Sequence, residues 1–136
     1  QVALADDSGL EVDALGGAPG VDSATFLGPH ATDDDRNRWV LARLRGLAEG
    51  LRTARYRAAI AVAAPDGTVR IFEGTCEGRI ADAPRGHGGF GYDPIFVVPA
   101  YGRTMAELPP DLKNRISHRA QALAAARAYL AELAAR

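Results

Sequence analysis

The chain has 136 residues, 47% hydrophobic and 24% charged, which suits one domain with its own core. Its formal net charge of −1 excludes a general field that attracts nucleic acid polymers or anionic membranes. No apolar run is long enough to span a bilayer, and Cys76 is the single cysteine, so no internal disulfide can form. We therefore predict one domain over residues 1–136, a reducing cytoplasmic location, and neither a membrane nor a nucleic acid polymer as partner.

The first motif is a pair of adjacent acids, Asp6 and Asp7, which follows a short apolar run typical of a strand. Ser8 and Gly9 come next, so we expect the strand to end at the acids. A carboxylate there can bind Mg²⁺ or act as a general base, although adjacent strand residues point to opposite faces. Asp, Ser and Gly also form turns and helix caps, and for this stretch alone the turn is the better interpretation.

Residues 32–47 have the pattern of an amphipathic helix that begins at the N-cap Thr32. Three acids follow, Asp33–Asp35, and we attribute them to the helix dipole rather than to a metal site. The predicted apolar stripe leaves Arg36 and Arg38 mostly outside it. Its members are Trp39, Val40, Arg43, Leu44 and Leu47.

Two strands and a turn come next and predict an antiparallel hairpin. Residues 55–64 are rich in small apolar side chains, so we expect a central strand that is buried on both faces. The turn is at 65–67, and 68–78 alternates as the second strand, with Cys76 as a small core residue. Helices mixed with strands and at least one hairpin predict an α/β fold around a mixed sheet.

A glycine-rich loop over residues 83–94 contains two aromatic residues, Phe90 and Tyr92. Aromatic rings held between glycines can stack on a flat ligand such as a nucleotide base. The alternative is that both rings simply cover the core, and the residues alone do not decide between these interpretations. A buried strand over 95–98 follows the loop.

The last third of the chain is predicted to be helical, with a turn at 104–108, a short helix at 111–116 and a final helix that Ser117 caps. We expect the final helix to reach about residue 135. Its predicted buried stripe consists of Ala120, Leu123, Leu130 and Leu133.

Basic side chains gather around the start of that final helix, where they oppose the helix dipole. They are Lys113, Arg115, His118 and Arg119. An anion or the edge of a base would explain such a cluster, and a solvated basic patch is the alternative. Acids that can hold a metal, rings that can stack and cations that can hold phosphate are together what a nucleotide requires.

Three sequence blocks resemble the inosine/xanthosine triphosphate pyrophosphatases. They are ADDSGLEVDALGGAPGV at 5–21, GGFGYDPIF at 88–96 and SHR at 117–119, in the order found in that family. The resemblance implies an elongated α/β fold, with helices flanking a long mixed sheet, and a homodimer. It also implies Mg²⁺-dependent hydrolysis of ITP, dITP and XTP to the monophosphate and pyrophosphate, which clears these nucleotides from the pool.

The same resemblance assigns roles to individual residues. Asp7 matches the proton acceptor and metal ligand, and Asp6 is a second, weaker candidate ligand. The residues that match substrate-binding positions are Ser8, Phe90, Gly91, Tyr92, Asp93, Lys113, His118 and Arg119. Phe90 is the expected stacking ring, and His118 with Arg119 is the pair expected at the purine edge.

Two features depart from the family pattern. The family's N-terminal strand and helix, with a Ser/Thr-x-Asn-x-x-Lys phosphate motif and a metal-binding glutamate, do not occur in this sequence, so we expect an N-terminally incomplete domain. Thr25 also stands where the family pattern has an arginine. The alternative hypothesis is therefore a non-catalytic remnant that binds purine nucleotides or dimerises.

Overall fold

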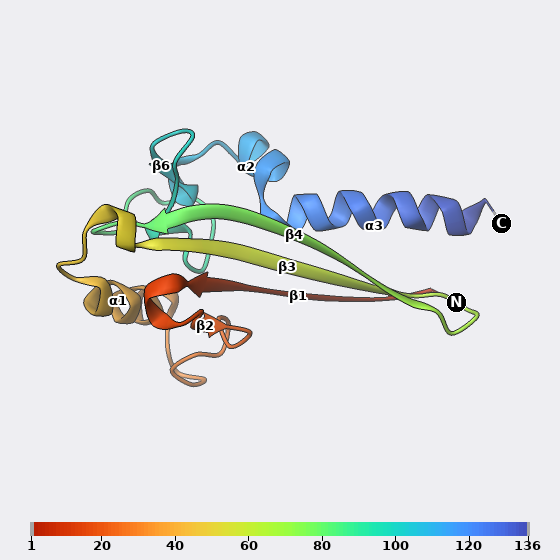
Figure 1. Cartoon of the computed structure of the whole chain (residues 1–136), viewed down its shortest axis with the longest axis horizontal. Coiled ribbons are helices and arrows are strands. Elements are labelled where there is room, and N and C mark those ends of the chain that lie inside the picture. Colours follow the sequence, from red (N-terminus) through yellow and green to blue (C-terminus); the bar gives the residue numbers. More distant parts are fainter. Residues whose placement is uncertain (1, 136) are drawn as a thin grey trace.

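The computed structural model describes residues 2–135 and shows an elongated molecule built on one twisted sheet (Figure 1). The strand order is β2-β1-β3-β4-β5-β6, and every pairing among them is antiparallel. The α/β class with flanking helices is thus confirmed, whereas the described strands include no parallel pair. The strands are β1 (Ala3–Val12), β2 (Pro19–Gly20), β3 (Thr53–Ala63), β4 (Val69–Ile80), β5 (Phe96–Val98) and β6 (Arg103–Thr104).

The helices are α1 (Asp33–Leu44), α2 (Pro110–Ile116) and α3 (His118–Ala134). Four short 3-10 helices complete the described elements: η1 (Asp13–Leu15), η2 (Glu49–Leu51), η3 (Asp93–Ile95) and η4 (Met105–Glu107). The predicted helical turn at 104–108 and the short helix at 111–116 are confirmed as η4 and α2. The strand predicted at 95–98 begins one residue later, because Ile95 belongs to η3.

Strand β1 runs without interruption through the acidic pair to Val12, so the predicted turn there is wrong. Each β1 residue pairs with a β3 residue, from Ala3 opposite Ala63 to Val12 opposite Ala54. This pairing gives the backbone N–H and C=O groups of the acidic stretch hydrogen-bond partners in β3, so no turn is needed to supply them. Tertiary pairing therefore overrides the local turn preference of Asp, Ser and Gly.

The predicted hairpin is confirmed as β3 and β4, and its turn closes where Ala64 N donates to Thr68 O at 2.8 Å. Strand β3 is buried on one face only, so the prediction of two buried faces is wrong. The buried residues alternate: Ala54, Tyr56, Ala58, Ile60 and Val62. Small side chains on the opposite face made the sequence look apolar throughout, although a sheet face can carry alanine and remain open to solvent.

Helix α1 begins as predicted, with a capping box between Thr32 and Asp35. Val40 and Leu44 pack into the core, and the helix ends at Leu44 rather than at residue 47. Arg36 was expected to lie off the buried stripe, but it is buried. Its guanidinium donates to the carbonyl oxygen of Phe26 at 2.8 Å, which supplies the partner that a buried charge requires.

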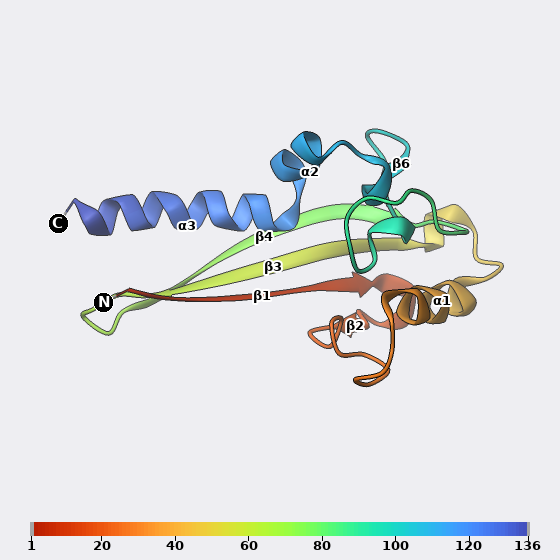
Figure 2. The same cartoon turned by 180° about the vertical axis from the view of Figure 1, so that it is seen from behind.

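Helix α3 begins at its predicted cap, because Ser117 Oγ accepts a hydrogen bond from Ala120 N at 3.1 Å. It lies along β3 and β4 (Figures 1 and 2). The predicted buried stripe is wrong in part, since the buried positions are Ala122, Ala126 and Tyr129. The predicted Leu130 and Leu133 are only partly buried against the same cluster. At Gly74 the helix approaches β4 so closely that the small Ala122 faces the sheet there, and Leu123 is left 41% exposed.

The buried face of the sheet carries two hydrophobic clusters, one under α1 and the 82–117 region and one under α3. Cys76 is buried in the first cluster, as predicted, and burial raises the pKa of its thiol. None of the helices within residues 2–135 has the length and apolar character needed to cross a membrane.

Candidate functional site

A pocket of about 850 Å³ opens between the end of β1, the start of α1, the glycine-rich loop, α2 and α3. Its volume is in the range of small-molecule sites. Eight of the residues singled out from the sequence line it: Ser8, Phe90, Gly91, Tyr92, Asp93, Lys113, His118 and Arg119. Three segments that are far apart in the chain therefore meet at one site, whereas Arg115 is exposed and does not line it.

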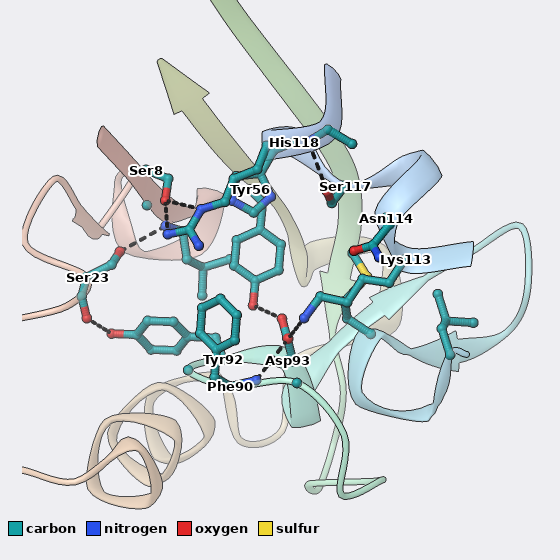
Figure 3. A pocket seen from close by; sticks show the side chains of 18 of the residues that line it. Ser8, Ser23, Tyr56, Phe90, Tyr92, Asp93, Lys113, Asn114, Ser117 and His118 are labelled. Carbon is teal, nitrogen blue, oxygen red and sulfur yellow. Dashed lines mark hydrogen bonds and ion pairs between the residues drawn. The ribbon is translucent and has the colours of Figure 1, made fainter. Parts of the chain in front are cut away.

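Asp93 is the centre of the polar network in the pocket (Figure 3). It is 4% exposed, and its carboxylate accepts hydrogen bonds from Tyr56 Oη at 2.8 Å, Phe90 N at 3.1 Å and Lys113 Nζ at 2.5 Å. These partners stabilise a buried carboxylate. The geometry makes Asp93 an anchor for the glycine-rich loop and Lys113, and its direct contact with a substrate stays a prediction.

The two aromatic residues of the glycine-rich loop have different environments. Tyr92 is buried, donates its hydroxyl to Ser23 O at 2.7 Å, and has its pKa raised to about 12 by burial. Phe90 is 61% exposed, with Lys113 Nζ 4.7 Å and Arg119 Cζ 5.4 Å from its ring centroid. The core-covering interpretation thus describes Tyr92, and Phe90 presents an accessible ring between two cations.

His118 stacks on the ring of Tyr56, with centroids 4.7 Å apart and planes 11° from parallel. Burial lowers the pKa of His118 to about 4. The positive charge of Arg119 also lowers this pKa, whereas the carboxylates of Asp93 and Asp6 raise it. The Nδ1 atom of His118 is buried and has no hydrogen-bond partner among residues 2–135. The imidazole is therefore neutral near pH 7, and its Nδ1 is a buried polar atom that the described residues leave unsatisfied.

Arg119 connects α3 to β1 across the pocket. Its Nη2 and Nε donate to Ser8 Oγ at 3.0 and 3.3 Å. Lysine and arginine are donors only, so the side chains of Lys113 and Arg119 give the pocket cationic donor character. Both groups can pair with a carbonyl or phosphate oxygen of a ligand.

Asp6 and Asp7 do not join the pocket lining. Ser8 pairs with the fully buried Ala58, whereas Asp7 pairs with Ala59 on the opposite face of the sheet. Alternation along β1 places Asp6 on the face of Ser8 and Asp7 on the other face. Both carboxylates are exposed.

The side chains of this chain offer few ligands for a metal ion. Within the described part of the chain, no group of three or more His, Cys, Asp or Glu side chains is arranged to hold an ion. A carboxylate oxygen is nevertheless a suitable Mg²⁺ ligand, and Mg²⁺ commonly takes one or two carboxylates together with substrate phosphates and water. Asp6 or Asp7 fits that requirement as one ligand.

Sequence reasoning missed several contributors to the pocket, among them Tyr56, Ser23 and Asp33. Tyr56 lies within the predicted strand over residues 55–64, between Arg55 and Arg57, and no local pattern marks it as a pocket residue. Asp33 was assigned to the helix dipole alone. No local signal identified Ser23, whose backbone carbonyl and hydroxyl contact segments distant in sequence.

The pocket combines an exposed aromatic ring with two cationic side chains, which is the chemistry needed to hold a flat ring that carries an anionic group. The chain belongs to the Ham1 family, whose profile matches residues 1–129. This confirms the family resemblance drawn from the three motifs.

Individual relatives give the same assignment. The chain is 55% identical over 120 residues to a dITP/XTP pyrophosphatase of Geobacillus kaustophilus, covering 88% of this chain and 59% of the relative. It is 57% identical over 122 residues to a dITP/XTP pyrophosphatase of Symbiobacterium thermophilum, covering 90% and 60%. The solved structure of the Staphylococcus aureus Ham1 protein superposes with a TM-score of 0.91 at 41% identity, covering 97% of this chain and 68% of that one. The chain thus spans about 60% of the length of the two curated relatives.

Proposed function

We propose that this chain forms the base-recognising part of a nucleoside triphosphate pyrophosphatase for nonstandard purines, with ITP, dITP and XTP as substrates. The observation that carries the proposal is the convergence of Phe90, Lys113, His118 and Arg119 on one pocket. The relatives named dITP/XTP pyrophosphatase support it, since they share more than half of the aligned residues.

Base recognition follows from the chemistry of the pocket. The exposed ring of Phe90 offers a surface on which a purine can stack, worth about 1–3 kcal/mol. A 6-oxopurine presents an acceptor where adenine presents an amino donor. The donor side chains of Lys113 and Arg119 pair with the first and oppose the second, and one buried unpaired group costs about 1–3 kcal/mol.

Asp7 is proposed as the proton acceptor that directs water at the α-phosphorus, with the nucleoside monophosphate and pyrophosphate as products. The base pocket lies on one face of β1 and Asp7 lies on the other. The phosphate chain of a nucleotide bound in the pocket must therefore pass around an edge of this strand to reach Asp7. Among the described strands, β2 pairs with β1 only at Leu10 and Glu11 on that edge. The exposed stretch 3–7 is therefore accessible for such a passage.

Mg²⁺ is the proposed cofactor, with Asp7 as its first candidate ligand from this chain and Asp6 as the second. When bound, the ion would neutralise negative charge on the phosphate oxygens. The residues of this chain would bind the base, orient the nucleotide through Lys113 and Arg119, and accept a proton at Asp7.

The remaining expectations belong to the same proposal. A single domain, a homodimer and a cytoplasmic location are proposed on the family resemblance, and the unpaired Cys76 is consistent with a reducing compartment.

The direct test measures pyrophosphate release from dITP and dATP in the presence of Mg²⁺. We expect dITP to be preferred, and an active preparation that prefers dATP would remove the substrate assignment. The Asp7→Asn variant should lose most of the rate, because an amide cannot accept the proton. Glu73→Gln is the matched control, because Glu73 is an exposed carboxylate that also pairs with Ala59 and has no proposed role, so this variant should keep its rate. Full activity of Asp7→Asn would refute the assignment of the base.

A second candidate function, a non-catalytic purine-nucleotide-binding or dimerisation protein, is favoured by the placement of Asp7 away from the pocket. It predicts that calorimetry detects the binding of inosine nucleotides, whereas no pyrophosphate is released from dITP. Turnover of dITP by the 136-residue chain would eliminate this candidate.

A further inference from the structure

Helix α1 holds the glycine-rich loop through two side chains that no motif had linked to a ligand. Asp33 Oδ2 accepts a hydrogen bond from Gly91 N at 3.0 Å, and Asn37 Nδ2 donates to Gly91 O at 3.1 Å. Asp33 and Asn37 are four residues apart, so they lie one above the other on the same face of the helix. Both backbone polar groups of Gly91 are therefore bound by α1.

The two side chains have different surroundings. Asn37 is 4% exposed, and Asp33 Oδ1 lies 3.6 Å from Nη1 of the buried Arg36. Arg36 is in turn held by the carbonyl oxygen of Phe26. The contact to Gly91 thus combines one buried side chain, Asn37, with one exposed carboxylate that pairs with a buried arginine.

The bound residue directly follows Phe90 and has an unusual backbone conformation. Gly91 has φ of 60°, in the left-handed region that glycine adopts without strain. Phe90 precedes it, and Phe90 N is bound to Asp93. The loop is consequently anchored on both sides of the exposed ring, from η3 at Phe90 and from α1 at Gly91.

We propose that Asp33 and Asn37 are positioning residues that hold the Phe90 ring in its base-stacking orientation. This inference rests on the proposed function, in which Phe90 stacks on a purine. A loop with several glycines would otherwise lose conformational entropy on binding, and ordering it in advance removes that cost from the affinity.

The neighbouring acids of α1 provide a natural control. Asp35 closes the capping box with Thr32, and Asp34 forms an exposed ion pair with Arg38. Asp33→Ala and Asp34→Ala each remove one negative charge from the first helical turn, so both weaken the dipole interaction similarly. Only Asp33→Ala removes the contact to Gly91.

The experiment measures the affinity of inosine monophosphate by calorimetry together with hydrogen exchange at the Gly91 amide. We expect Asp33→Ala to weaken binding about fivefold and to speed exchange at Gly91, since one charge-assisted hydrogen bond is lost. Asn37→Ala should weaken binding similarly, whereas Asp34→Ala should match the unmodified protein. Asp33→Asn keeps a side-chain oxygen acceptor and should restore most of the affinity.

In turnover of dITP, Asp33→Ala and Asn37→Ala should raise KM while kcat stays within about twofold, because a misplaced ring weakens binding without changing the reacting groups. Unchanged affinity in Asp33→Ala, or an equal loss in Asp34→Ala, would overturn the positioning role. If the unmodified protein itself failed to bind inosine monophosphate, the proposed function would fall. The Gly91 exchange rates would then still decide whether α1 restrains the loop.

Discussion

Gly74 determines how closely α3 can pack on the sheet, and enlarging it should separate the two. A methyl group at this position of β4 would collide with the carbonyl oxygen of His118 and lie 2.8 Å from Ala122 N. Both are backbone atoms of α3, so no side chain can rotate away. Overpacking of this kind costs about 1–3 kcal/mol, and rigid backbone neighbours place Gly74→Ala toward the upper end.

We therefore expect Gly74→Ala to lower the free energy of unfolding by about 2–3 kcal/mol, measured by urea denaturation. Gly50→Ala is the matched control, because a methyl group there meets no atom within 4 Å and Gly50 has no positive φ. Its effect should stay within about 1 kcal/mol and can be stabilising. The reasoning would be refuted if Gly74→Ala unfolded at the same urea concentration as the unmodified protein.

Three further predictions concern buried charge, pH and the stacking ring. Arg52→Met removes donors to the carbonyl oxygens of Leu44, Ile80 and Ala81, at 2.5, 2.9 and 2.7 Å. It should cost about 3 kcal/mol in urea unfolding, whereas Arg38→Met, which breaks an exposed ion pair, should cost about 0.5 kcal/mol or less. Because the pKa of His118 falls from 6.5 to about 4 on folding, its contribution to stability is complete above pH 6.5 and is lost as the pH decreases toward 4. Between pH 7 and 5 the unmodified protein should lose about 1 kcal/mol more than His118→Gln, and equal losses would contradict the depressed pKa. Phe90→Leu should weaken inosine monophosphate binding about tenfold in calorimetry with little change in stability, and unaltered affinity would argue against stacking.

Local chemistry predicted the helix starts and the hairpin well. Thr32 and Ser117 cap α1 and α3 as expected, because N-cap preferences depend on one side chain and a few nearby amides. Pro65 and Gly67 likewise identified the turn between β3 and β4. These features are decided within a few residues, so the sequence contains the necessary information.

Long-range packing could not be predicted in the same way. The acidic pair looked like a turn because nothing near Asp7 shows that β3 will pair with β1 along its whole length. The stripe of α3 was misassigned because the close approach at Gly74 favours alanine over Leu123. Both errors arise where a distant partner, rather than the local pattern, determines which side chain is buried.

The pocket residues were predicted mainly through family motifs, and the structure adds how they are held. Sequence alone could not show that Asp93 is anchored by Tyr56, since the two are 37 positions apart and no periodic pattern relates them. It also could not show that α1 holds Gly91. The site therefore combines two kinds of contact. Ligand contacts are expected from the motifs, whereas positioning contacts are visible only in the three-dimensional structure.

The most direct test of the central claim compares the affinities of inosine monophosphate and adenosine monophosphate in the same calorimetric experiment. The donor side chains of Lys113 and Arg119 predict that the 6-oxo nucleotide binds at least about tenfold more tightly. Equal affinities, or tighter binding of the adenine nucleotide, would contradict the assignment of this pocket to 6-oxopurines.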